Sequence, residues 1–464
     1  MAHADGALSL DVSPDLEKND LGALRDWVRA FRIDEIECVT PDLAGIARGK
    51  VMPAAKFLHE TEMRLPSSMF FATINGSYAG NDRPELHTDP DLVLTPDLST
   101  ARAVPWAADR SLQIIHDVFD GSGAPSPVAP REVLRRVCAL YAERGWQPLV
   151  APEIEFYLTK PNTDPDYPLE PPVGRSGRTS LGNQAFSISA VDEFDRVVAL
   201  IYDYADAQSL SIDTIIQEAG AAQMEINTYH GHPVDLADRV FFFKRLIREA
   251  ALRCDTYATF MAKPHEDQPG SAMHIHLSVT DRETGANIFS AADGSASPAY
   301  DHFIGGQQAH FYAATALIAP YVNSYRRLVP GWAAPINLDW GVENRSTGLR
   351  APRSAPEARR VENRLAGADA NPYLAIAACL AAGYLGLTQR TAARPEVTDN
   401  AYTGRRELPP DLLSAIEALG ASAPLREVLG DPFVDTFVAV KREEHEQFMR
   451  VISPWEREHL LLNV

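Results

Sequence analysis

The sequence predicts an α+β fold in two parts, a small N-terminal domain and a larger C-terminal domain. Three observations support this division: strand-like alternation near the N-terminus, a Pro-, Gly- and Ser-rich segment at residues 121–130, and long amphipathic helices mixed with strands after it. We therefore expect a flexible N-terminus at residues 1–19, a first domain at 20–125 and a second domain at 126–464.

Hydrophobic periodicity and capping residues predict individual helices and strands in each domain. In the first, a helix is expected over residues 21–31 with Asn19 or Asp20 as its N-cap, followed by a half-buried strand over 33–40. In the second, the sequence predicts a strand at 149–158 and helices at 235–254 and 370–387. Helices collected on one side of a mostly antiparallel sheet would give this domain its α+β character.

The composition excludes several classes of protein. The 464 residues include 43 basic and 63 acidic side chains, a formal charge of -20, which argues against nucleic-acid binding and is compatible with a cationic substrate. The four cysteines form no CxxC pair, so neither a disulfide framework nor a zinc module is expected. The N-terminus lacks the pattern of a secretory signal, and no apolar run approaches the roughly 20 residues that span a bilayer. A cytoplasmic protein is the expectation.

Acidic residues are paired in the second domain. Glu153 and Glu155 are two residues apart on a predicted strand, so both carboxylates face the same side. Glu218 and Glu225 flank small residues that suggest a tight bend between two strand-like pieces. Taken singly, the first pair is equally typical of a strand with one solvent face, and the second of a polar loop at a sheet edge.

Two further features complete a possible metal site. His274 and His276 alternate on a strand, and Glu362 lies in an arginine-rich run. Alone, these patterns indicate a hydrogen-bonded pair and a salt-bridge network. Together with the four glutamates above, however, Glu362 and one of the two histidines make five carboxylates and one imidazole, a ligand set suited to Mg²⁺ or Mn²⁺.

A cluster of arginines accompanies these residues. Guanidinium groups bind phosphates and carboxylates in a bidentate manner, so carboxylate-held divalent ions facing them would suit phosphoryl transfer from a nucleotide to an acid. No Walker A motif or kinase-type Gly-rich loop is present in the sequence, so the nucleotide site must be of another kind. The arginines are Arg327, Arg345, Arg350, Arg359, Arg360 and Arg364.

These motifs resemble those of the type I glutamine synthetase family. The resemblance extends from about residue 35 to the C-terminus. It is carried by seven segments in the family's order, PEIEFYL (152–158), QEAGAAQMEI (217–226), ATFMAKP (258–264), GSAMHIHLS (270–278), NSYRRLVPG (323–331), ENRSTGLRAP (343–352) and ARRVENRLAGADANPYLA (358–375).

The resemblance implies a role for each site residue. The first divalent ion would be held by Glu155, Glu218 and Glu225, and the second, which bridges the ATP phosphates, by Glu153, His274 and Glu362. Residues that position glutamate would be Gly270, Arg327 and Arg364. The transferred phosphoryl group would be neutralised by Arg345 and Arg350, and the nucleotide contacted by His276, Ser278 and Arg350. Arg327, Arg345 and Arg350 are thus the expected catalytic arginines.

The resemblance also implies a reaction and an assembly. The γ-carboxylate of glutamate would attack the γ-phosphate of ATP, and an amine would then displace phosphate from γ-glutamyl phosphate. Family members have a β-grasp-like N-terminal domain and a catalytic α+β domain, and they form double-ring dodecamers with active sites between neighbouring subunits. The helical tail at residues 438–464 fits such an assembly, or docks within its own chain.

The residues at the amine-binding positions differ from those of the ammonia-using members of the family. Those enzymes hold ammonium with two acidic residues; at the first position this chain has Thr73 or Asn75, and at the second it has Ala333 beside Trp332. A small cation is poorly desolvated and deprotonated without such anions. We therefore expect an amine pocket formed by Thr73, Asn75, Trp332 and Ala333, with room for a substituent on the amine.

Within the family, the chain resembles the γ-glutamylpolyamine branch, which includes γ-glutamylputrescine synthetases and begins polyamine catabolism. The shared segments are DLAGIARGKVMP, TFMAKP, VNSYRR and AGADANPYL. The expected function is an ATP-dependent glutamate–amine ligase acting on putrescine or spermidine. A γ-glutamylethanolamide synthetase, an ammonia-dependent glutamine synthetase and a catalytically silent homologue remain open alternatives.

Overall fold

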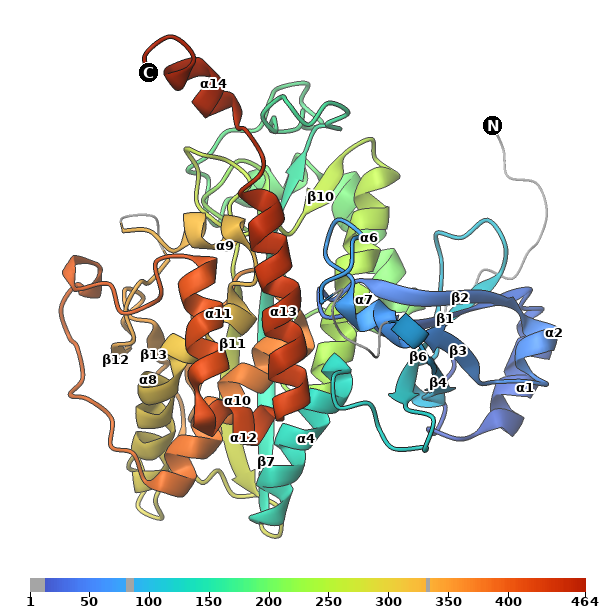
Figure 1. Cartoon of the computed structure of the whole chain (residues 1–464), viewed down its shortest axis with the longest axis horizontal. Helices are drawn as coiled ribbons and strands as arrows, with labels where there is room; N and C mark the ends of the chain where they lie inside the picture. The colour runs from blue at the N-terminus through green and yellow to red at the C-terminus, as the bar shows by residue number, and fades with distance from the viewer. Residues whose placement is uncertain (1–12, 81–86, 331–333) are drawn as a thin grey trace.

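Two β-sheets organise the chain, and the computed structural model describes residues 13–80, 87–330 and 334–464 (Figure 1). The N-terminal sheet has the order β2-β1-β6-β4-β3, with β5 paired to β6, and β1 runs parallel to β6. Its strands are β1 (Glu35–Pro41), β2 (Ala47–Pro53), β3 (Met63–Pro66), β4 (Asp91–Pro96), β5 (Arg102–Ala103) and β6 (Ser111–Phe119).

Short helices cover this first sheet. In α1, the predicted cap is confirmed, because the Asp20 side chain accepts a hydrogen bond from the Ala23 amide at 2.9 Å. Leu24 and Val28, one helical turn apart, are buried in the core of the sheet. The helices are α1 (Leu21–Phe31), α2 (Ala54–Phe57), η1 (Ser67–Phe71) and η2 (Leu98–Thr100).

The second sheet is mostly antiparallel, with the order β12-β13-β14-β11-β7-β9-β8 and β10 paired to β7. Only β12 and β13 pair in parallel among its described strands. The mixed helix and sheet content confirms the α+β prediction. The strands are β7 (Trp146–Thr159), β8 (Thr214–Gln217), β9 (Gln223–Asn227), β10 (Tyr257–Thr259), β11 (Met273–Asp281), β12 (Trp340–Val342), β13 (Leu349–Ala351) and β14 (Val361–Asn363).

Helices pack against one face of the second sheet. On β7, Ile154, Phe156 and Leu158 are fully buried in the main hydrophobic core, and α4 and α7 contact this strand. Alternate residues therefore face the other side. The helices of this part are α4 (Pro130–Glu143), α5 (Ile188–Asp192), α6 (Asp195–Ala207), α7 (Pro233–Leu252), α8 (Pro298–Ile318), α9 (Val322–Arg327), η3 (Pro356–Ala358), α10 (Pro372–Gln389), η4 (Ala401–Thr403), α11 (Leu412–Ala421), α12 (Ala423–Leu429), α13 (Asp431–Phe448) and α14 (Pro454–Leu460).

Helix α10 is the centre of the helical layer. By length and composition it is the one helix in the described ranges that is apolar enough to cross a membrane, with a mean hydropathy of 1.2. However, 89% of it is buried inside the protein, and it packs against α8, α4 and α7. Its apolar composition is therefore that of a core helix.

A buried ion cluster joins the first sheet to the helices of the second part. The Arg131 guanidinium, near the start of α4, lies 2.6 Å from an Asp117 oxygen of β6, 2.7 Å from Asp238 of α7 and 3.0 Å from Asp97. The Tyr373 hydroxyl donates a further hydrogen bond to Asp238 at 2.6 Å. Buried charges are costly to separate once paired, so this cluster fixes the first sheet against the second part of the chain.

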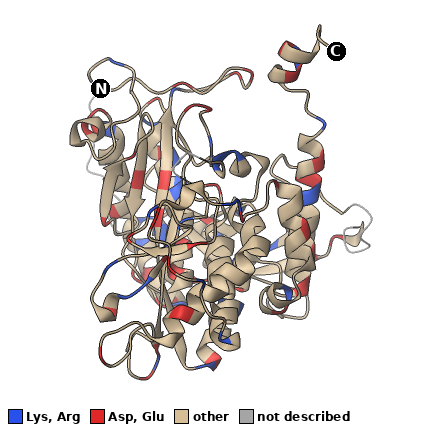
Figure 2. Ribbon diagram, turned by 90° about the vertical axis from the view of Figure 1, so that its left-hand side faces the viewer, with Lys and Arg blue, Asp and Glu red and all other residues tan. Residues whose placement is uncertain are grey.

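The C-terminal helix α14 stands away from the rest of the chain in both views (Figures 1 and 2). Figure 2 also shows acidic and basic segments interspersed along most elements. The apolar side chains of this tail are strongly exposed, with Trp455 at 62% and Leu462 at 92%.

Candidate active site

Strand register brings the predicted metal ligands together. His274 of β11 is the direct partner of Glu153 on β7, Glu155 is opposite Glu225 of β9, and His276 is opposite Glu362 of β14. Directly opposed residues of an antiparallel pair have neighbouring side chains. Residues more than 200 positions apart in the sequence therefore meet on one face of four adjacent strands.

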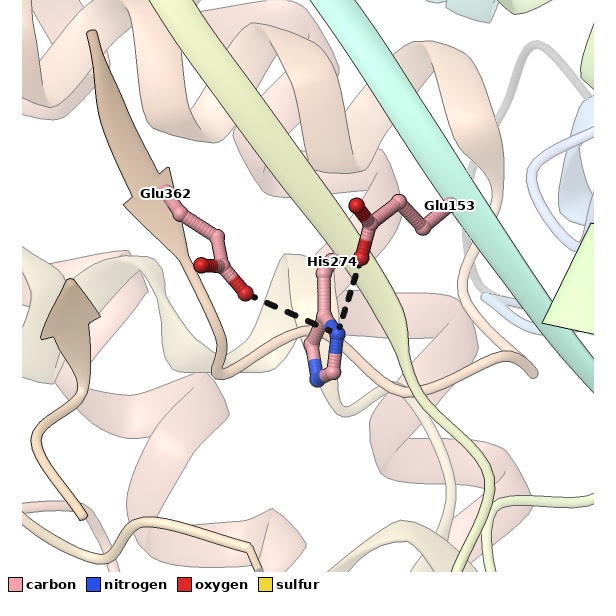
Figure 3. A group of neighbouring side chains, drawn as sticks. All are labelled: Glu153, His274 and Glu362. Atoms are coloured by element: carbon pink, nitrogen blue, oxygen red, sulfur yellow. Dashed lines mark ion pairs between the residues drawn. The ribbon is translucent and has the colours of Figure 1, made fainter. Parts of the chain in front are cut away.

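Glu153, His274 and Glu362 form the first group that could hold a metal ion (Figure 3). His274 Nδ1 lies 3.4 Å from a Glu153 oxygen and 3.8 Å from a Glu362 oxygen. Glu155 and Glu225 form a second group, which also includes His274. Glu218, the sixth predicted ligand, belongs to neither of these compact groups, but it lines the same cavity as the other five predicted ligands.

Burial and mutual repulsion act on the carboxylates of the second group. Burial, followed by the charge of Glu218, raises the pKa of Glu155, and burial, followed by the charge of Glu155, raises the pKa of Glu225. Burial also raises the pKa of Glu218. Three carboxylates crowded together fit a site for a divalent ion, because a bound cation relieves such repulsion.

In the group around His274, by contrast, the pKa values are lowered. Burial lowers the pKa of His274 to about 4, which keeps the imidazole neutral and available as a ligand. Although burial alone would raise the pKa of Glu153, hydrogen bonds from His274 and His276 lower it. Burial is likewise outweighed at Glu362, where the adjacent Arg364 lowers the pKa. Ionised carboxylates beside a neutral imidazole also suit Mg²⁺ or Mn²⁺.

The predicted arginines surround these carboxylates. Arg350 donates to Glu362 at 2.7 Å, Arg364 pairs with the other Glu362 oxygen, and the Nε atoms of both arginines lack a partner among the described residues. Arg345 lines the cavity with an exposed side chain that makes no hydrogen bond or ion pair with any described residue. The exposed guanidinium of Arg345 remains available to an anionic substrate.

Arg327 is held rigidly by the backbone. Its guanidinium donates to the carbonyl oxygens of Leu365 at 2.9 Å and Arg364 at 3.1 Å. Gly270 packs against it so closely that a Cβ there would lie 2.6 Å from Arg327 Cγ and 2.5 Å from the Ala262 carbonyl oxygen. The close approach therefore requires glycine at this position.

Two cavities meet at the metal ligands. One of about 290 Å³ is lined by the six predicted ligands, by Gly270 and by Arg327, Arg345, Arg350 and Arg364. A second, of about 610 Å³, is lined by His276, Ser278 and Arg360 and shares Glu153 and Asn227 with the first. His276 bridges Glu153 at 2.8 Å and Arg360 at 3.2 Å. Arg359 instead bonds to backbone oxygens of residues 289–295.

The predicted amine-pocket residues lie elsewhere or outside the described ranges. Thr73 and Asn75 do not line either cavity; the Ile74 amide between them donates to Glu444 of α13 at 2.8 Å, and Asn75 donates to Gln447. Trp332 and Ala333 lie outside the described residues. Their neighbour Ala334 does line the first cavity.

Several lining residues were not predicted from the sequence. Gln223 donates to Glu155 at 3.1 Å and to the Gly270 carbonyl at 3.1 Å, which ties β9 to the glycine loop. Phe186 and Ile216 line the first cavity next to Glu218. Gln223 lies between the predicted ligands Glu218 and Glu225, so the sequence contained a signal for it. Phe186 lies in a loop with no periodic pattern, so the sequence contained no such signal.

The chain belongs to the glutamine synthetase family, because the family described as "Glutamine synthetase, catalytic domain" matches residues 127–460. Members of this family are ATP-dependent ligases that form carbon–nitrogen bonds, and they use ATP with divalent metal ions. The resemblance inferred from the motifs is therefore confirmed.

The relatives include both a γ-glutamylputrescine synthetase and glutamine synthetases. The chain is 36% identical over 442 residues to the γ-glutamylputrescine synthetase PuuA of Escherichia coli, covering 92% of each chain. It is 32% identical over 436 residues to a glutamine synthetase of Pyrococcus abyssi, again covering 92% of each. A solved structure titled "Apo GmaS without ligand" superposes with a TM-score of 0.80 at 29% identity, covering 95% of this chain and 99% of the other.

Proposed function

We propose that this chain is a glutamate–amine ligase that forms the γ-glutamyl amide of an organic amine, with putrescine or spermidine as its substrate. One observation carries the proposal. Among the described residues, every carboxylate that lines the first cavity belongs to the predicted metal-ligand set. No further described carboxylate therefore lines this cavity to desolvate and deprotonate ammonium. The similarity to a γ-glutamylputrescine synthetase supports the same choice.

The proposed chemistry has two steps. The γ-carboxylate of glutamate attacks the γ-phosphorus of ATP, giving γ-glutamyl phosphate and ADP; the amine nitrogen then attacks the acyl carbon, and phosphate leaves. Arg327 and Arg364 hold glutamate, while Arg345 and Arg350 receive the charge of the transferred phosphoryl oxygens. When bound, Mg²⁺ or Mn²⁺ screens the negative charge of the phosphates.

The residues divide between two metal positions and a nucleotide position. Glu155, Glu218 and Glu225 would hold one divalent ion, and Glu153, His274 and Glu362 would hold the other; when bound, the two ions would neutralise negative charge on the acceptor carboxylate and the phosphates. His276 and Ser278 contact the nucleotide. The cavity that they line, next to the shared Glu153, supports this assignment.

We infer further that the enzyme acts in the cytoplasm as an assembly of identical chains, as a dodecamer of two hexameric rings. The four cysteines are free thiols, as in a reducing compartment. The exposed apolar tail at α14 supports contact with another chain. In such an assembly, Thr73 and Asn75 would complete the amine pocket of a neighbouring subunit, since they do not line the cavity of their own.

A panel of amines tests the proposed function. Purified protein with Mg²⁺, ATP and glutamate is offered ammonium, putrescine, spermidine and ethanolamine separately, and phosphate release and product mass are followed. We expect γ-glutamyl amides of the polyamines, formed at least about 100-fold more efficiently than glutamine, because a missing anionic partner costs a small cation several kcal/mol. Preferred turnover of ethanolamine would move the assignment to a monoamine, and turnover of ammonium alone would overturn it.

A further inference from the structure

Phe186 is an aromatic side chain at an unusual place, on the lining of the acidic cavity. It lines this cavity together with Ile216 and Glu218. Yet 67% of its surface is exposed, so the ring is not part of the hydrophobic core. The benzyl group is thus presented to whatever enters the cavity.

The backbone around Phe186 is held in a disfavoured conformation. Phe186 has a φ of +63°, in the left-handed region that bulky residues rarely adopt, and Asn183 has the same φ. Both are anchored to the strand and turn that carry Glu218: the Phe186 amide donates to the Gln217 carbonyl at 2.8 Å, and the Asn183 amide to the Ala219 carbonyl at 2.7 Å. Such outliers persist where the surroundings fix them, and they cluster at binding sites.

The cavity has an anion-binding part and a part that suits a cation. Its arginines offer donors for the carboxylate and phosphoryl groups of glutamate and ATP. Phe186 instead lines the cavity with the apolar side chain of Ile216, beside Glu218, which is one of the proposed metal ligands. An aromatic face attracts a cation within about 6 Å, and apolar neighbours accept methylene groups.

We propose that Phe186 determines amine specificity, with its ring contacting the methylene chain and the remote ammonium group of a diamine whose other nitrogen is acylated. This inference rests on the proposed function, because it assigns a residue to the organic amine. Phe186 takes no part in the bond-making steps. Its effect is on the binding of an amine that carries a second cationic end.

Replacing Phe186 with leucine separates this role from a structural one. For Phe186→Leu, we expect the KM for putrescine to rise about 5- to 20-fold, the size of a partly desolvated cation–π contact. The KM values for glutamate and ATP should not change. Hydroxylamine, a small acceptor without a second cationic end, should be used with unchanged KM and kcat. Phe186→Tyr, which keeps the aromatic face, should restore the wild-type KM for putrescine.

A matched control is available on the same segment of chain. Tyr167 is also an exposed aromatic residue, at 71%, but it does not line the acidic cavity. Tyr167→Leu should leave every KM unchanged. An unchanged KM for putrescine in Phe186→Leu, or an equal rise for putrescine and hydroxylamine, would overturn the inference while leaving the proposed function intact. A wild-type enzyme that acylates no organic amine would overturn both.

Discussion

Glu225→Gln is expected to lower kcat by at least about 10³-fold and, at the same time, to make the metal-free protein more stable at alkaline pH. Activity falls because one carboxylate of a divalent-ion group is lost. Stability rises because the group that is removed is a buried carboxyl crowded by others. Opposite signs for activity and stability are a stringent expectation for a single substitution.

The pH dependence follows from the direction of the shift. Burial, with the charges of Glu155, Glu153 and Glu218, raises the pKa of Glu225 from 4.5 to about 9. Between these values, the unfolded chain has lost the proton while the folded metal-free protein retains it. Its free energy of unfolding therefore decreases as pH rises from about 4.5 towards about 9. Glutamine has no proton to lose, so this contribution disappears in the variant.

Thermal unfolding with and without Mg²⁺ measures both effects. In the wild type, the gain in Tm on adding Mg²⁺ should increase between pH 6 and about 9, because metal binds the deprotonated carboxylates. In Glu225→Gln, the gain should shrink at every pH, and the metal-free Tm should exceed that of the wild type by roughly 2–4 °C at alkaline pH. The exposed Glu446 provides the control substitution, Glu446→Gln. Equal metal-dependent gains in Glu225→Gln and wild type would contradict the assignment of Glu225 as a ligand.

Arg345→Ala should have the second-largest effect, lowering kcat by about 10²- to 10³-fold with no change in Tm. Its guanidinium is exposed at the cavity and makes no hydrogen bond or ion pair with any described residue, so its removal breaks no direct contact in the folded state. The charge that it would stabilise is present only while the phosphoryl group is transferred. The KM for ATP should therefore change much less than kcat.

Initial rates of phosphate release at varied ATP and glutamate concentrations provide this measurement. Arg353→Ala is the matched control, since Arg353 is also exposed and lies only eight positions further along the chain but does not line the cavity. It should keep wild-type kinetics. If Arg345→Ala kept the wild-type kcat and raised only the KM for ATP, the arginine would bind the ground state of the nucleotide rather than the transferred group.

Local pattern was enough to predict the direction of the β7 side chains and one turn. Alternation on β7 places Glu153 and Glu155 on the face opposite Ile154 and Phe156, and the structure shows this arrangement. The small residues before Gln223 do form the turn between β8 and β9. Both inferences depend only on neighbours in sequence, where backbone geometry fixes the direction of side chains.

Strand order and docking between distant segments could not be predicted in this way. The register that opposes His276 to Glu362 pairs strands about 85 residues apart, and nothing in either segment specifies its partner. Asn75 is a similar case, because its contact with Gln447 joins residues 372 positions apart. Phe186 was missed because its exposure and positive φ are properties of an anchored loop rather than of a sequence pattern.

The most direct test of the account follows the oxygen atoms of glutamate. With the γ-carboxyl group labelled with ¹⁸O, attack on ATP places one labelled oxygen in the bond to phosphorus, and attack by the amine then releases it as phosphate. With putrescine as acceptor, we predict one ¹⁸O in phosphate for each γ-glutamylputrescine formed. Unlabelled phosphate would contradict the account. So would labelled phosphate that forms when ammonium is the acceptor but not when any organic amine is the acceptor.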